Sequence, residues 1–169
     1  MTFIILVLII AAASAAAFFY VSIIISTLPN GRAEDYLNSN DQQDKKIIAC
    51  VGDSLTHGNI GQSWVDYLRE EFPNDIFLNE GINANTTWQV LQRLEPIFEC
   101  KPDLVILMIG TNDALGSFDT DSGLRYKKNN NLPEVPSFEN IKNSYLSLLR
   151  RLGFNLRLRS APSLLSVKM

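Results

Sequence analysis

Three short apolar runs alternate with segments of helical periodicity, and this alternation constrains the fold more than any other feature of the sequence. The runs lie at 47–51, 76–79 and 104–109. Apolar residues recur at helical spacing in 62–72, 87–98 and 137–152. Because strands that alternate with helices usually pair in parallel, the pattern predicts an α/β domain with a parallel sheet. Between the last two elements, 116–136 is predicted to be a long polar loop.

The N-terminal segment differs from the rest of the chain, because residues 1–31 contain no charged side chain. Phe3 to Ile25 is apolar except for Ser14, Tyr20 and Ser22. These 23 residues, at about 1.5 Å each, are long enough to cross a hydrocarbon core of about 30 Å. We therefore expect a transmembrane anchor over 1–28. A cleavable signal peptide is the alternative, since 13–15 offers a small-residue cleavage site, although a charged n-region is missing.

These features suggest an organisation for the whole chain. A polar linker is expected at 29–44, the α/β domain at 45–152 and an atypical tail at 153–169. With the anchor retained, the protein is a single-pass membrane protein. With the segment cleaved, it is secreted or lumenal. The few charges near the apolar segment leave its orientation open.

Composition excludes several function classes. A net charge of −3 and a pI of about 5.1 argue against general nucleic-acid binding. The chain has one histidine and two cysteines, so a three-histidine zinc site, an HExxH helix and a four-cysteine site are excluded. Cys50 and Cys100 have neither CxxC spacing nor a partner histidine and are predicted to be buried free thiols.

A polar cluster follows each predicted strand. The clusters are Gly52-Asp53-Ser54-Leu55, Asn79-Glu80-Gly81-Ile82-Asn83 and Gly110-Thr111-Asn112-Asp113. Each alone is also typical of a turn or a helix cap. Ligands of parallel sheets, however, bind outside the carboxyl ends of the strands, where all three clusters are expected. A serine hydroxyl, a backbone N–H and an amide donor at one site suit acyl transfer.

The three clusters resemble, in order and in position, the first three sequence blocks of the SGNH (GDSL-type) hydrolases. The resemblance covers residues 46–152 and implies a flavodoxin-like, three-layer α/β/α fold. It makes Ser54 the nucleophile. It also makes the Ser54 backbone N–H, the Gly81 backbone N–H and the Asn112 side chain the oxyanion hole. Members of this family hydrolyse lipid, acyl or acetylated-sugar esters, without a metal or an organic cofactor.

The last block of the family, Asp-x-x-His near the C-terminus, has no counterpart in the sequence. The single histidine, His57, lies one helical turn after Ser54, and a residue there points along the helix flank rather than into a crevice. We therefore expect His57 not to be the general base. The tail at 153–169 suggests a truncated, alternatively spliced or frame-shifted end, with a short edge strand conceivable at 154–159. The domain is thus expected to be incomplete at its C-terminus.

Two functions from different classes follow. The first is an ester hydrolase that is impaired because the catalytic histidine block is missing. The second is a non-catalytic, membrane-tethered module that binds an acyl or carbohydrate ligand. In either case the third strand, 104–109, is expected at an open hydrophobic edge of the sheet, and the stability of the chain is expected to be marginal.

Overall fold

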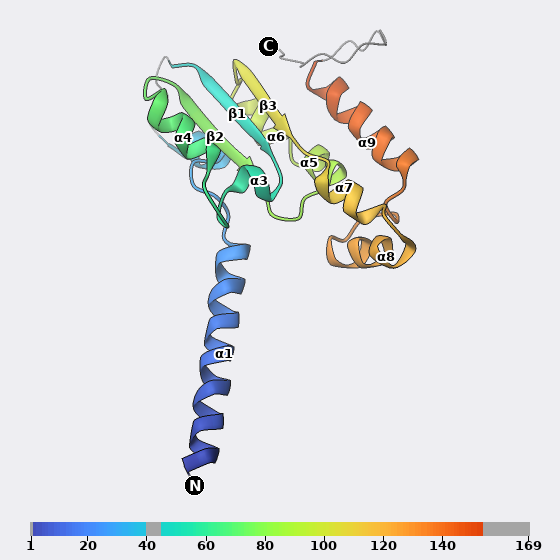
Figure 1. Ribbon diagram of the computed structural model, residues 1–169. Coiled ribbons are helices and arrows are strands. Elements are labelled where there is room, and N and C mark those ends of the chain that lie inside the picture. The colour runs from blue at the N-terminus through green and yellow to red at the C-terminus, as the bar shows by residue number, and fades with distance from the viewer. Residues whose placement is uncertain (1, 40–44, 154–169) are drawn as a thin grey trace.

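A computed structural model describes residues 2–39 and 45–153. Its centre is a parallel three-stranded sheet of β1 (Ile47–Gly52), β2 (Ile76–Gly81) and β3 (Leu104–Met108), in the order β2-β1-β3 (Figure 1). β1 is buried at every position, as expected of a central parallel strand. The predicted α/β class with a parallel sheet is confirmed, and the first strand lies between the other two.

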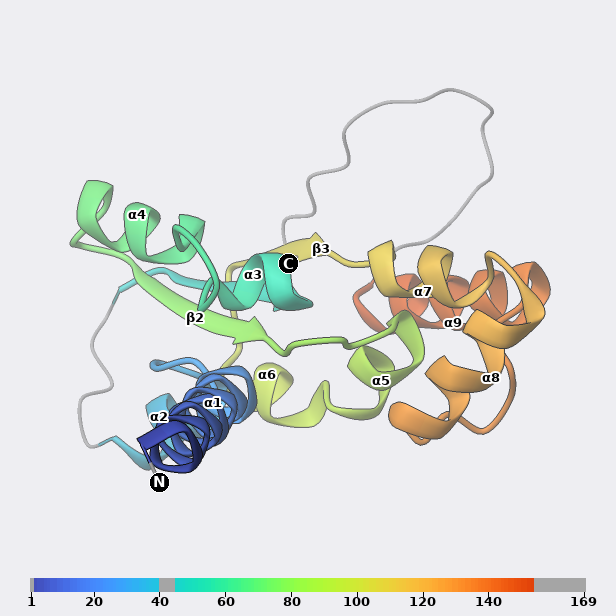
Figure 2. The same cartoon turned by 60° about the horizontal axis from the view of Figure 1, so that its bottom comes forward.

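Helices cover both faces of the sheet and make three layers (Figure 2). Alternate residues of β1 point to opposite faces, as the period of a strand requires. Ile48 and Cys50 pack with Val65 of α4 (Trp64–Glu71) on one face. Ala49 and Val51 pack on the other face, against α2 (Ala33–Asn38), α5 (Thr87–Gln92), α6 (Glu95–Glu99) and α9 (Phe138–Arg151). The three-layer arrangement is therefore confirmed.

Local capping explains where several helices begin. Ser63 accepts a hydrogen bond from Asp66 N at the start of α4, and Ser137 accepts one from Asn140 N at the start of α9. Two short helices follow strands directly, and they are α3 (Ser54–His57) after β1 and α7 (Thr111–Gly116) after β3. The helices expected at 62–72 and 137–152 are thus confirmed, with ends shifted by one or two residues.

The predicted helix at 87–98 is wrong as a single element, because the structure has α5 and α6 in its place. Pro96 lies in the first turn of α6. A proline has no N–H and its ring clashes with the carbonyl four residues earlier, so a helix cannot run through this position without a break. Apolar spacing alone does not reveal that break.

The predicted polar loop at 116–136 is also wrong in part, since it contains α8 (Thr120–Asn129). Asp119 starts this helix by accepting a 2.7 Å hydrogen bond from Ser122 N. Most side chains of α8 are exposed, so the helix lacks the apolar stripe that periodicity detects.

The segment expected to be a polar linker is structured where the structure describes it. α2 begins with a capping box in which Asp35 accepts a hydrogen bond from Arg32 N. Ala33 is completely buried and lies in the main core cluster. Residues 32–38 are therefore packed on the domain, whereas 40–44 lie outside the described residues.

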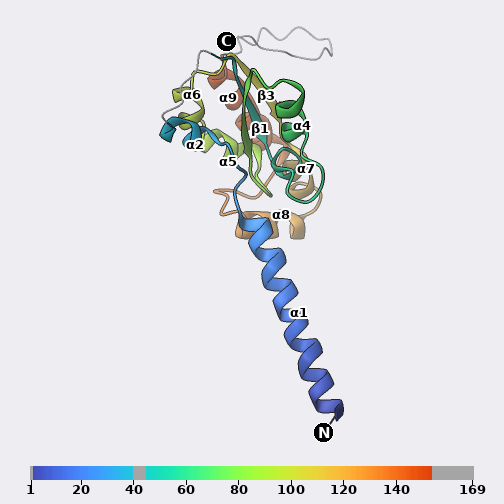
Figure 3. The ribbon, with the colours of Figure 1, turned by 90° about the vertical axis from the view of Figure 1, so that its left-hand side faces the viewer.

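The N-terminal apolar segment forms α1 (Thr2–Ser26), a single helix that extends away from the α/β domain (Figure 3). Within the described chain it is the one helix long and apolar enough to cross a membrane, over Phe3–Ser26. Its large apolar side chains are exposed to the surroundings.

β3 pairs with β1 along one edge, and no further strand pairs with it within residues 2–39 and 45–153. Its residues are partly buried and Met108 is 39% exposed, in contrast to the fully buried β1. An unpaired hydrophobic edge is an aggregation hazard, as expected from the sequence. The edge strand considered at 154–159 lies outside the described residues.

Candidate functional site

The strand register brings the three polar clusters to one edge of the sheet. Gly52 at the end of β1 is aligned with Gly81 of β2 and with Met108 of β3. Ser54 and Asn112 each follow their aligned strand end by a few residues, and Gly81 is itself a strand end. Polar atoms from all three strands therefore lie at the carboxyl edge, where ligands of parallel sheets bind.

Ser54 is the first residue of α3 and is exposed. The turn into the helix is fixed by Asp53, which is 1% exposed and accepts a 3.1 Å hydrogen bond from Leu55 N. Position 52 accepts only glycine, because a Cβ there would lie 2.4 Å from the Met108 carbonyl oxygen. Since the first N–H groups of a helix have no intrahelical acceptor, the Ser54 N–H is a suitable donor for an anion.

Gly81 lies directly against α3. A Cβ at this position would be 2.0 Å from the His57 backbone nitrogen and 2.5 Å from the Thr56 carbonyl carbon, so no side chain fits. The Gly81 N–H donates a 3.0 Å hydrogen bond to Asn79 Oδ1, and Asn79 Nδ2 donates to the His57 carbonyl. Asn79 thereby joins the second cluster to the helix that carries Ser54.

Asn112 is buried on α7 and its carboxamide is held on both sides. Nδ2 donates to the Asn85 carbonyl oxygen at 3.0 Å and to Asp53 Oδ2 at 3.4 Å. Oδ1 accepts a hydrogen bond from the Tyr126 hydroxyl of α8 at 3.2 Å. These contacts fix which end of the amide carries the donors, and they turn those donors toward the residue preceding Ser54.

Asp113 anchors the start of α5 rather than facing the serine. Its carboxylate accepts hydrogen bonds from Thr87 N at 2.9 Å and from Thr87 Oγ1 at 3.1 Å. Burial raises the pKa of Asp113 above its ordinary value, and the nearby Asp53 carboxylate contributes in the same direction. The hydrogen bonds from Thr87 oppose this rise.

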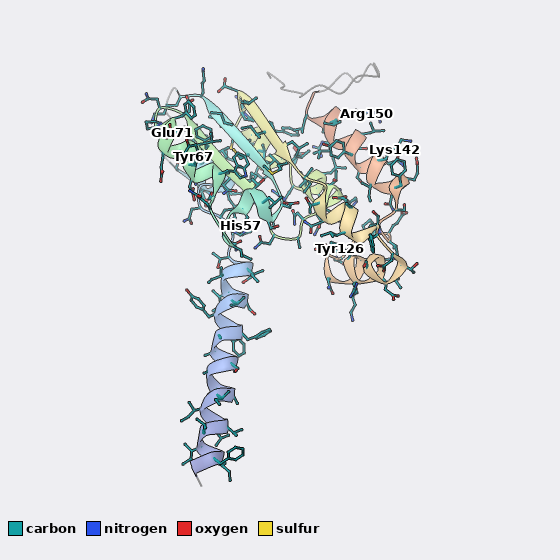
Figure 4. All side chains as sticks on the ribbon, in the orientation of Figure 1. His57, Tyr67, Glu71, Tyr126, Lys142 and Arg150 are labelled. Carbon is teal, nitrogen blue, oxygen red and sulfur yellow. The ribbon has the colours of Figure 1, made fainter. Side chains whose placement is uncertain are left out.

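His57 is the last residue of α3. It lines a hollow at the junction with α1, together with Ile24 and Asn59, and Figure 4 places it next to the end of that helix. His57 is 7% exposed, and its Nδ1 has no hydrogen-bond partner among the residues that the structure describes. Burial lowers the pKa of His57 below its ordinary value, and a hydrogen bond with Asn83 acts in the opposite direction. That His57 is not the base stays a prediction.

A buried ion-pair network lies next to the carboxyl ends of β1 and β2. Glu80 is 1% exposed, and its Oε2 lies 3.1 Å from Arg32 Nη2 and 3.0 Å from Arg93 Nη1. Arg93 also donates to the carbonyl oxygens of Gly52 at 3.2 Å and Glu80 at 2.8 Å. Burial lowers the pKa of Arg93 to about 10, while Glu80 acts in the opposite direction. One guanidinium thus ties the ends of β1 and β2 together.

Sequence reasoning missed two members of this arrangement. Tyr126 comes from α8, inside the segment predicted to be a loop, and nothing in its local sequence indicates a contact with Asn112. Arg93 is an ordinary helical residue by pattern, although a buried Glu80 next to Gly81 implies a basic partner somewhere in the fold.

A cavity of about 320 Å³ opens beside Asp113, between α5 and α9. It is lined by both apolar side chains, such as Trp88 and Leu132, and polar ones, such as Asn140. It offers space near the third cluster for part of a small molecule. Within the described ranges, no group of three or more His, Cys, Asp or Glu side chains is arranged to hold a metal ion.

Comparison with known proteins gives one matching family and several similar solved structures. Residues 50–156 match the model of the GDSL-like lipase/acylhydrolase family. Among solved structures, the chain is similar to AlinE4, an SGNH-hydrolase family esterase. The identity is 24%, with 66% of this chain and 55% of that chain covered and a TM-score of 0.47. The chain is also similar to a variant of Axe2, an acetyl xylan esterase from Geobacillus stearothermophilus. The identity is 24%, with 64% of this chain and 55% of that chain covered and a TM-score of 0.49. No curated protein matches the chain significantly.

The psychrotrophic esterase EstA from Pseudoalteromonas sp. is also similar, at 21% identity, 63% and 53% coverage and a TM-score of 0.46. The chain spans about half the length of each of these solved structures. The family match covers well over half of the 169 residues and includes all three clusters. The chain therefore belongs to the GDSL-like lipase/acylhydrolase family.

Proposed function

We propose that this chain is an ester hydrolase in which Ser54 is the nucleophile. The observation that carries the proposal is the contact between Asn112 Nδ2 and Asp53 Oδ2, because it brings the amide of the third cluster to the residue preceding Ser54. The second cluster meets the same helix through Gly81. A hydroxyl and donors from three strand ends are what attack on an ester carbonyl requires.

The oxyanion that forms during acyl transfer is assigned three donors: Ser54 N–H, Gly81 N–H and Asn112 Nδ2. Two of them have internal acceptors in the free protein, namely Asn79 Oδ1 and the Asp53 carboxylate. Catalytic hydrogen bonds of free enzymes are often long and tighten only when substrate is bound. The 3.4 Å contact to Asp53 is the longer of the two Asn112 donations, so it is the one that an oxyanion replaces.

The proposal includes weak catalysis, because no histidine other than His57 lies among the residues that the structure describes. The only histidine of the chain, His57, lies on the α1 side of α3 and is buried. Without a general base the Ser54 hydroxyl is a weak nucleophile, so turnover through Ser54 is expected to be slow.

Hydrolysis of p-nitrophenyl acetate by the full chain, in detergent micelles, tests these roles. We expect slow turnover that Ser54→Ala abolishes and that Asn112→Ala lowers, since one oxyanion donor is worth about 10²–10³-fold. His57→Ala is the matched control and should keep the rate. Loss of turnover in His57→Ala would identify it as the base and contradict the assignment.

No turnover by the unmodified chain, together with retained ligand binding, would instead indicate the non-catalytic binding module. A covalent adduct at Ser54 separates the two functions, because binding alone requires no reactive hydroxyl.

The proposed substrate is a small ester with a lipid, acyl or acetylated-sugar group, which the protein handles without a cofactor.

We also propose that α1 is a single-pass membrane anchor. Support comes from its largely apolar span of 24 residues, which exceeds the roughly 20 residues needed to cross a bilayer, and from the absence of burial along this span. Cleavage of this segment would give a secreted or lumenal form.

A further inference from the structure

α1 does not leave the domain at an arbitrary place. In Figures 1 and 3 it extends from the side where α3 and α8 lie, which is the side of the strand carboxyl ends. Asn59 Nδ2 donates a 2.6 Å hydrogen bond to the Ile24 carbonyl, and Asn83 Nδ2 donates a 2.7 Å bond to the Ile25 carbonyl. The two asparagines belong to the loops that follow α3 and β2, and Asn83 is part of the second cluster.

These two bonds fix the distance between the loops and the apolar helix. The last carbonyls of a helix lack intrahelical partners and need outside donors. Here the donors come from the domain, at the final turn of the apolar span, which ends at Ser26. A loop bonded to that turn lies at the depth where the hydrocarbon region ends.

The connection between α1 and α2 is also hydrogen-bonded to the domain. Six residues separate the end of α1 from the start of α2. Arg69 donates to the carbonyl oxygens of Asn30 and Gly31, and Ala33 N donates to the buried Glu80 carboxylate at 2.8 Å. The connection is therefore held against β2 and α4 rather than being a free tether.

The helices and loops at the strand carboxyl ends carry large exposed apolar side chains. Leu55 is 55% exposed, Ile60 is 73% exposed and Phe118, between α7 and α8, is 84% exposed. α8 adds three exposed basic side chains, which are Arg125, Lys127 and Lys128. Apolar side chains with neighbouring basic ones favour the interface of a bilayer that contains anionic lipids.

We propose that the strand-end face, defined by Leu55, Ile60, Phe118 and α8, is a second membrane-contact surface. With α1 spanning the bilayer, this surface rests on the headgroup region, and the edge that carries Ser54 opens toward the membrane rather than toward bulk water. The inference rests on the proposed anchoring by α1, but it does not depend on catalysis at Ser54.

Depth-dependent fluorescence quenching tests the orientation. The full chain is reconstituted into vesicles of phosphatidylcholine and phosphatidylserine that contain a headgroup nitroxide lipid. A thiol-reactive fluorophore is attached to Ile60→Cys, Phe118→Cys or the control Glu71→Cys. Glu71 is exposed and lies at the end of the domain remote from α1 (Figure 4). The native Cys50 and Cys100 are 0% and 5% exposed, so they leave the label at the introduced site.

We expect at least threefold stronger quenching at positions 60 and 118 than at position 71. Equal quenching at all three positions, or stronger quenching at 71, would overturn the proposal. Failure of the chain to float with the vesicles would overturn it too, because the anchor would then be absent. Repeating the measurement in a Ser54→Ala background should give the same pattern, so a failure of the hydrolase assignment remains distinguishable from a failure of this one.

Discussion

Replacement of Glu80 by alanine should destabilise the domain strongly. The Glu80 carboxylate is 1% exposed and accepts from Arg32, Arg93 and Ala33 N at 3.1, 3.0 and 2.8 Å. Removing one partner of a buried ion pair costs about 3–5 kcal/mol, because the remaining charge stays buried without compensation. That loss is a large part of the roughly 5–15 kcal/mol that holds a typical domain together.

Glu80→Gln separates charge from hydrogen bonding. The glutamine keeps an oxygen that can accept from Ala33 N, but it no longer neutralises Arg93, which is largely buried. We expect a loss of about 2 kcal/mol for this variant, smaller than for alanine. Glu70→Ala is the matched control, since Glu70 is exposed on α4 and its replacement should change the free energy of unfolding by less than about 0.5 kcal/mol.

Urea unfolding of the full chain in detergent micelles, followed by fluorescence of Trp64 and Trp88, measures these differences. With a slope of about 2 kcal/mol/M, a loss of about 4 kcal/mol moves the midpoint by about 2 M. A Glu80→Ala variant whose free energy of unfolding falls by less than about 1 kcal/mol would refute the reasoning, because the network would then contribute no more than a surface pair.

Three further predictions concern single residues. Gly81→Ala should lower the free energy of unfolding by about 2 kcal/mol or more, because the new Cβ would lie 2.0 Å from the His57 backbone nitrogen. Thermal unfolding monitored by circular dichroism measures the loss, and an unchanged unfolding midpoint would contradict the prediction. The pKa of His57 is lowered by burial, so its contribution to stability is present above pH 6.5 and is lost as the pH falls through the pKa of the folded state. In His57→Gln, the free energy of unfolding measured from pH 7.5 to 5 should therefore depend less on pH than in the unmodified chain. The same pH dependence in both chains would argue against this reasoning. Burial raises the pKa values of Cys50 and Cys100 to about 12 and about 11, so iodoacetamide at pH 8 should modify both thiols only after the chain unfolds. Mass spectrometry detects the modification, and rapid modification of the folded chain would contradict this prediction.

The sequence was sufficient to predict the strands and their parallel pairing, because β1 and β3 are continuous apolar runs and parallel strands need helical crossovers. It was not sufficient for α8, whose start depends on the Asp119 cap rather than on an apolar stripe. The break between α5 and α6 was signalled by Pro96, but the apolar period concealed it.

At the candidate site, the residue types and the shared edge could be predicted, whereas the bonding pattern could not. The link between Asn112 and Tyr126 joins segments that only the fold brings together. The bond from Asn83 to the end of α1 likewise joins residues 58 positions apart, and no local pattern marks it. Such contacts depend on tertiary geometry, so periodicity and motif spacing carry no information about them.

The rate at which a fluorophosphonate labels Ser54 is the most direct test of the central claim, that Ser54 and the Asn112 amide act on one oxyanion position. Intact-mass and peptide-mass measurements on the full chain give the labelled residue and the rate. We predict slow labelling at Ser54 alone, at least about 100-fold slower in folded Asn112→Ala. Labelling of other serines, or an unchanged rate in Asn112→Ala, would contradict the account.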